Sequence, residues 1–196
     1  MRRPSSAARL RSDQRGAAIV DFAILLMPLL ILLLGLIDLG FRAYVGVTLQ
    51  GALNNVAREV TVSSTTTTTQ ITTLVRSRVN SVLPSASVTV TPSSYYDFTH
   101  VGRPEPITTD TAPLNVYNTG DCFTDLNGNG SWDADSGSAG TGNSDDIVYY
   151  TATASYQALV PIQAFFGRTS SESVTATAMF KNQPYASQAE PATVCT

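Results

Sequence analysis

The stretch AAIVDFAILLMPLLILLLGLIDLGF, residues 17–41, decides the fold of the N-terminal part of this chain. It has no charged residue between Phe22 and Ile37, and its 25 residues are enough to cross ~30 Å of hydrocarbon as a helix. Pro28 lies inside the run, and membrane helices accommodate a proline by local rearrangement. We therefore expect a transmembrane helix over residues 17–41.

Charge on either side of this helix predicts its orientation. The arginines that precede it are Arg2, Arg3, Arg9, Arg11 and Arg15. Cationic segments cross the membrane poorly, so we expect the N-terminus in the cytoplasm of a bacterium and the remainder outside its inner membrane. No basic patch follows the helix, which disfavours nucleic acid as a partner.

A cleavable secretory signal is the alternative reading of this N-terminus. It would need an A-x-A-like site soon after the apolar run, and none follows at the proper distance. Instead Leu49, Leu53, Val56 and Val60 recur at helical spacing. We expect a retained signal-anchor whose helix continues outside the membrane over residues 42–63.

Asp21 is the residue that an ordinary membrane helix does not explain, because a carboxylate there costs free energy without a partner. One interpretation places it among lipid headgroups in the first helical turn, where the helix dipole favours it. The other interpretation uses its neighbours: Gly16 follows basic residues, and Ala17 begins a run of small or apolar residues up to Asp21 and Phe22. That order resembles a prepilin-peptidase site, which implies cleavage after Gly16 and a basic cytoplasmic leader over residues 1–16.

Two segments together resemble one family. They are RGAAIVDFAILLMPLLILLLGLIDLGFRAYVGVTLQGALNNVAREV (15–60) and ESVTATAMFKNQPY (172–185). Their order is similar to that of the TadE-like pseudopilins of tight-adherence (Flp) pilus systems, although the family's usual Glu is Asp21 here. The resemblance implies a minor pilin-like subunit for pilus assembly, not an enzyme. It also implies, as partners, other pilin-like subunits bound through the apolar helix, a prepilin peptidase and inner-membrane assembly proteins.

The sequence of residues 64–196, which we expect to be exported, predicts an α+β domain. The STTTTTQ stretch at 64–70 predicts a break in helical structure, and residues 71–83 predict a short amphipathic helix that ends at Pro84. Alternating β-branched runs predict strands at 86–92, 146–160 and 172–182. We expect a long helix and a short helix packed on a small antiparallel sheet, a pilin-like lollipop, with a long polar insertion at about 93–145.

The insertion contains the spacing of an EF-hand-type calcium loop. Gly130 would supply the turn, and the oxygen ligands would be Asp125, Asn127, Asn129 and Asp133, with Asp135, Asp145 or Asp146 completing the shell. Ser136 stands where the bidentate Glu belongs and no helix precedes the loop, so a true EF-hand is not expected. The alternatives are a helix-less calcium loop of extracellular type and a polar loop with chance spacing. Calcium is the only cofactor that the sequence suggests.

Cys122 and Cys195 lie far apart and form no CxxC motif; in an exported domain their expected state is a disulfide.

Catalysis finds no support, because His100 stands alone in a polar loop and no nucleophile, metal or phosphate motif occurs. The rival to the pilus subunit is therefore a membrane-tethered periplasmic binding module, stabilised by calcium and using aromatics such as Tyr95, Tyr96 and Phe98. Whether the protein enters the pilus or stays at its base is left open.

Overall fold

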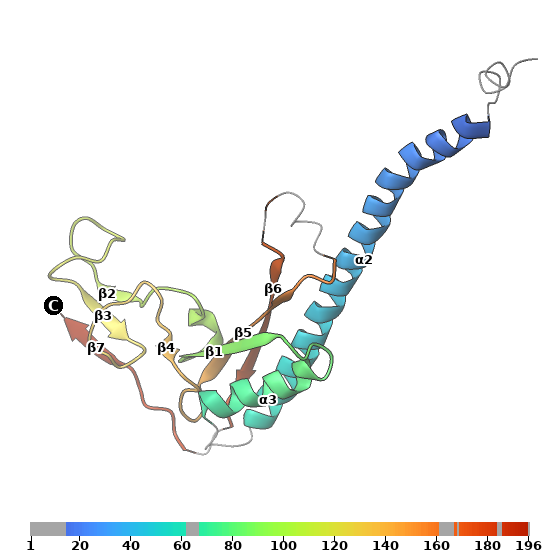
Figure 1. Cartoon of the computed structure of the whole chain (residues 1–196). Helices are drawn as coiled ribbons and strands as arrows, with labels where there is room; N and C mark the ends of the chain where they lie inside the picture. Colours follow the sequence, from blue (N-terminus) through green and yellow to red (C-terminus); the bar gives the residue numbers. More distant parts are fainter. Residues whose placement is uncertain (1–14, 62–66, 161–166, 168, 184–185, 196) are drawn as a thin grey trace, which may run out of the picture. The chain divides into compact units, whose positions relative to one another are not determined.

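The computed structural model describes residues 15–61, 67–160, 167, 169–183 and 186–195, and within these it leaves the side chains of residues 15–18 undescribed. Of the basic leader expected at 1–16, residues 1–14 therefore lie outside the described residues. The chain divides into two compact units: Met1–Ala43 with Ala158–Ser170, and Tyr44–Gln157 with Ser171–Thr196. The helix α2, Arg15–Val60, runs without interruption from the first unit into the second (Figure 1).

The first part of α2 is apolar and exposed. Leu25, Met27 and Leu39 have exposed fractions of 69%, 71% and 64%, and no charge occurs between Phe22 and Ile37. Pro28 lies inside the helix without ending it. By length and composition, this helix can cross a membrane.

Within the second unit, α2 changes character and contributes to a core. Its buried side chains recur every three or four residues, so they share one face: Val45, Leu49, Ala52, Leu53, Val56, Ala57 and Val60. Gln50 Nε2 donates to the carbonyl of Thr177 at 2.8 Å, which fixes this helical segment to a strand. The continuation of the helix predicted from the spacing of Leu49, Leu53, Val56 and Val60 therefore serves to bury an apolar face.

The helix α3 spans Thr68–Asn80 and starts earlier than expected. Residues 64–70 were expected to break helical structure, but Thr67 caps the helix: its hydroxyl accepts from Gln70 N, and Gln70 Oε1 accepts from Thr67 N. This capping box overcomes the poor helix propensity of threonine. Ile71, Val75 and Val79 are buried, as their spacing predicts.

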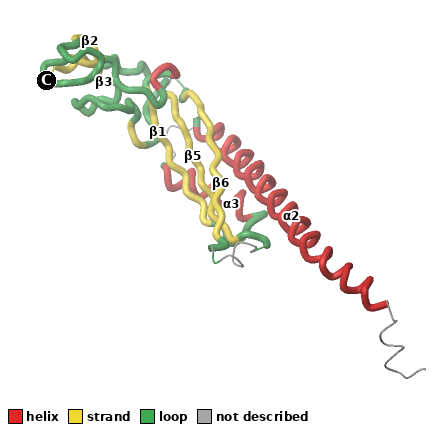
Figure 2. Tube along the Cα trace, turned by 90° about the horizontal axis from the view of Figure 1, so that it is seen from above, coloured by secondary structure: helices red, strands yellow, loops and turns green. Residues whose placement is uncertain are grey.

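The larger sheet has the strand order β4-β1-β5-β6 and is antiparallel. Its strands are β1 (Ser87–Tyr95), β4 (Ser138–Ala139), β5 (Ile147–Gln157) and β6 (Ser171–Lys181), of which β1, β5 and β6 run side by side in Figure 2. One face buries small residues, with Ala152 paired to Ala176, and the other exposes hydroxyls such as Thr89 and Thr175. Alternation of this kind is typical of an antiparallel sheet covered on one face.

A second antiparallel sheet joins two strands of the polar insertion to a strand near the C-terminus, although composition predicts only a loop for the insertion. Its order is β2-β3-β7, with β2 at Ile107–Thr109, β3 at Cys122–Asp125 and β7 at Ala192–Cys195. A 3₁₀ turn, Phe98–His100, precedes it. The α+β class predicted from the sequence is confirmed, and the insertion is more ordered than its composition suggested.

Candidate functional site

The proposed processing segment lies at the start of α2. Gly16 and Ala17 fall in the helix but their side chains are not described, whereas Asp21 and Phe22 are exposed. Among the described residues Asp21 has no hydrogen bond or ion pair. A carboxylate on an apolar, exposed helix is available to pair with a cation from another chain.

The disulfide joins the insertion to the C-terminal strand. Cys122 and Cys195 are opposite each other in β3 and β7, and their sulfur atoms are bonded at a sequence separation of 73. The structure thus contains the pairing expected for an exported domain. The C-terminal strand is held by this bond and by its ladder on β3.

The disulfide should measurably stabilise the second compact unit, which contains both cysteines. Closing a loop of this length restricts the unfolded chain and is expected to contribute about 3–5 kcal/mol. The Cys122→Ser, Cys195→Ser double variant of the full chain should melt lower than the oxidised protein and like the reduced one. Two thiols that alkylate without prior reduction in protein taken from the membrane would contradict this prediction.

The loop from Asp125 to Asp133 folds tightly around its own first residue. Asp125 Oδ1 accepts from the backbone N–H of Gly128 at 2.7 Å and of Asn129 at 3.2 Å, and its Oδ2 accepts from Gly130 N at 2.8 Å. Gly128 and Gly130 have positive φ angles of 74° and 77°, a conformation that glycine adopts without strain. The alternating polar residues therefore curl around one centre instead of extending into solvent.

Three of the other expected calcium ligands meet inside this loop. The side-chain amides of Asn127 and Asn129 donate to Asp133 Oδ2 at 2.8 and 2.6 Å. No three His, Cys, Asp or Glu side chains converge as metal ligands anywhere in the described parts of the chain. A calcium ion would thus depend on the Asn oxygens, reached by rotating the amides, and on backbone carbonyls.

Asp135, expected as a calcium ligand, and Ser136, which stands in the place of the bidentate Glu, both lie outside this loop. Asp135 Oδ2 accepts from the Tyr95 hydroxyl at 3.3 Å, and its Oδ1 accepts from Gly137 N. Ser136 is buried and donates to the His100 carbonyl at 3.1 Å. Neither side chain joins Asp125, so the turn after Asp133 directs both away from the loop.

Glu105 is the residue that sequence reasoning missed. Its exposed fraction is 2%, and its two carboxylate oxygens accept from Leu126 N at 2.8 Å and from Asp133 N at 3.1 Å. Burial raises the pKa of this carboxyl above its ordinary value, and the two N–H donors oppose the rise. The one sequence signal was the position of this acid between Pro104 and Pro106.

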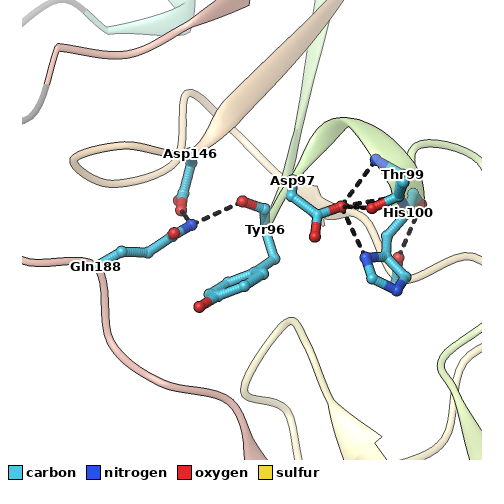
Figure 3. Close-up of polar contacts among 7 residues, drawn as sticks. Tyr96, Asp97, Thr99, His100, Asp146 and Gln188 are labelled. Carbon is cyan, nitrogen blue, oxygen red and sulfur yellow. Dashed lines mark hydrogen bonds and ion pairs between the residues drawn. The ribbon is translucent and has the colours of Figure 1, made fainter.

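A carboxylate also orders the turn that follows β1. Asp97 Oδ1 accepts from the Thr99 backbone N–H at 2.8 Å and from His100 Nδ1 at 2.7 Å, as the close-up shows (Figure 3). Although burial opposes it, hydrogen bonds from the Thr99 hydroxyl and from the His100 ring hold the pKa of Asp97 below its ordinary value. His100 is therefore a loop histidine oriented by Asp97. In the same view Gln188 bridges Asp146 and the Tyr96 carbonyl.

Asp121 stabilises the loop that precedes Cys122 by hydrogen bonds. Its Oδ1 accepts from the Thr111 backbone N–H and hydroxyl, and its Oδ2 accepts from Asn118 N. The Thr111 N–H bond is the main reason why the pKa of Asp121 lies below its ordinary value. The stabilisation by Asp121 is therefore present above the pKa of the unfolded carboxyl and is lost as pH falls through the folded value.

These features define a class: an α+β protein with one apolar helix long enough to span a membrane and a polar, disulfide-linked domain. Comparison with known families refines it. The family model described as "TadE-like protein" matches residues 16–58, so the chain carries a TadE-like segment, and the resemblance predicted from the sequence is confirmed. The match supports involvement in a tight-adherence pilus. No curated protein and no solved structure matches the chain.

Proposed function

We propose that this protein is a minor pilin-like subunit, a pseudopilin, needed to assemble a tight-adherence pilus. The observation that carries the proposal is the continuous helix α2, whose apolar first part is exposed and whose match to the TadE-like family spans residues 16–58. The role is structural and not catalytic. A helix that is apolar around its circumference requires either lipid or neighbouring apolar helices.

The same proposal includes the topology and the processing of the chain. The leader at 1–16 is cytoplasmic and is removed by a prepilin peptidase, residues 17–41 cross the inner membrane, and residues 64–196 are extracytoplasmic. The arginines before Gly16 support this orientation. After cleavage, Asp21 becomes the fifth residue and can pair with the new ammonium group of a neighbouring pilin-like chain.

Site-specific photocrosslinking in the native membrane tests the association directly. A photoreactive residue in place of Leu32, which is 58% exposed on α2, should give adducts with other pilin-like chains. The same residue in place of Thr73, exposed on α3, should give few. Adducts at Leu32 with lipid alone, in cells that are making pili, would contradict lateral association.

A second candidate function is a membrane-tethered, calcium-stabilised binding module. It is favoured by one observation: Asp125 accepts three successive backbone N–H groups while Asn127, Asn129 and Asp133 gather in the same loop. This is an arrangement in which alternate oxygens can surround one ion. Such a module is also compatible with a pilus subunit, since a calcium loop can stabilise an exported domain of either kind.

The calcium loop gives a measurable prediction. Lacking a bidentate Glu, the site should have a dissociation constant of ~10⁻⁴–10⁻³ M and add only about 1 kcal/mol of stability in millimolar calcium. Trp132, the single tryptophan, should report the ordering of the loop by its fluorescence. Asp125→Ala should abolish the response and Asp135→Ala should preserve it. No response to calcium up to several millimolar would show that this segment is a polar loop that binds no calcium.

A further inference from the structure

A cleft of about 840 Å³ opens beside the calcium-like loop, within the second compact unit. We call it the aromatic cleft and define it by the side chains His100, Arg103, Asp110, Asn115, Tyr117 and Trp132. They come from the turn after β1, the segment after β2 and the loop after β3. Pockets of this size bury most of a drug-sized molecule.

Two rings form a rigid surface in this cleft. Tyr117 and Trp132 are stacked, with ring centroids 4.8 Å apart and planes 8° from parallel. Tyr117 also packs edge-on against the buried Phe123 at 5.7 Å, and Trp132 Nε1 donates to the Glu105 carbonyl at 3.0 Å. Both rings are therefore held in place before any ligand arrives, which lowers the entropic cost of binding.

Hydrogen-bond donors and acceptors both surround the rings. With His100 Nδ1–H donating to Asp97, the other ring nitrogen of the neutral imidazole, Nε2, is an acceptor. Arg103 is exposed and supplies N–H donors. Asp110 Oδ2 accepts from Asn115 N, and its Oδ1 is buried without a hydrogen-bond partner among the described residues. A buried carboxylate oxygen without a donor is costly, and a ligand hydroxyl would correct this once the side chain turns.

Charge and shape narrow the class of ligand. Arg103 faces the cleft together with the carboxylates of Asp110 and Glu105, so the lining does not favour an anion. The two oxygens of Glu105 already accept from backbone N–H groups, which leaves Arg103 and Asp110 as the charged groups that can bond to a ligand. A single arginine is too little for a nucleic acid. A neutral molecule with one flat C–H face and a rim of hydroxyls fits an aromatic surface ringed by donors and acceptors, and that description is a pyranose ring.

We propose that the aromatic cleft binds a neutral oligosaccharide. One pyranose ring lies on the Trp132–Tyr117 surface, and its hydroxyls bond to Arg103, His100 and Asp110. The proposal goes beyond the assembly role and does not depend on it, because it uses only the exported unit. Asp97 acts as a positioning residue through His100 and does not touch the sugar.

The test uses the full chain in a detergent without a sugar head group, at a fixed calcium concentration so that the loop does not change. Maltotriose, cellotriose and triacetylchitotriose are titrated separately while Trp132 fluorescence is followed. At least one should give a saturable change in about the millimolar range, the affinity expected of one small cleft. Glycerol, which has hydroxyls but no ring, should give none.

Variants decide whether any binding occurs in the cleft. Arg103→Ala should weaken it about tenfold, the loss expected for a charge-assisted hydrogen bond. Arg58→Ala, an exposed arginine on α2, is the matched control and should leave the dissociation constant unchanged. Tyr117→Ala should also weaken binding, with circular dichroism as the check on folding. No saturable response to any trisaccharide, or an equal response in Arg103→Ala and Arg58→Ala, would overturn the proposal.

Discussion

Replacing Gly16 with leucine is expected to leave the protein at its full-length mass, whereas the wild-type protein is expected to lose residues 1–16. A peptidase that cuts after glycine approaches the backbone closely, and a side chain at that position blocks the approach. Intact mass spectrometry of protein extracted from the membrane measures the difference directly. Because cleavage either happens or does not, this is the largest effect that we expect.

Gly35→Leu is the matched control for that experiment. Gly35 lies in the same helix, and a Cβ added there meets nothing within 4 Å, so this variant should fold and be cleaved normally. A Gly16→Leu protein with the short mass would contradict the prediction, because cleavage after position 16 would then not require glycine. A wild-type protein that keeps residues 1–16 would indicate a plain membrane anchor.

Asp21→Ala is expected to be cleaved normally yet to reduce the number of surface pili about tenfold or more. The carboxylate is proposed to pair with the new N-terminal ammonium of a neighbouring chain, and removal of one partner leaves the other charge uncompensated in an apolar environment. Pili counted by electron microscopy and the mass of the mature protein separate assembly from processing. The two readouts must be taken from the same cells.

Asp21→Glu provides the control for charge, because it adds one methylene and keeps the carboxylate. It should assemble pili, whereas Asp21→Asn, which keeps the shape and removes the charge, should not. Pili at the wild-type number in Asp21→Ala, with the protein present in normal amount, would count against the pairing. In that case the headgroup position at the first helical turn would explain Asp21 instead.

The helices and the main strands were predictable because their signals are local. The apolar run at 17–41 decides a membrane-length helix through length and composition, and α3 follows from the 3.6-residue spacing of Ile71, Val75 and Val79. The strands β5 and β6 show period-two alternation over most of their length. The start of α3 was misplaced, since threonine has a low propensity inside a helix but is a good N-cap. The ends of α2 and α3, at Val60 and Asn80, each come three residues before the predicted ends.

The insertion was not predictable as a folded region, because its order depends on contacts between residues far apart in sequence. The strands β2, β3 and β7 are short, and β7 pairs with β3 across some seventy residues. Composition rich in Gly, Asn, Asp and Ser indicates turns but not which turns meet. A disulfide could be expected if the domain is exported. The pairing of β3 with β7, which places the two cysteines opposite each other, could not be expected.

The sequence by itself determined the membrane-length helix, the α+β class and the spacing of Asp125, Asn127, Asn129 and Asp133. Each of these depends on residues that are close neighbours, so chain geometry fixes their relation. The tertiary structure decided that Glu105 closes the calcium-like loop and that Asp135 leaves it. It also brought Tyr117 beside Trp132 and placed Asp110 near Arg103, because only folding brings segments together that no local period relates.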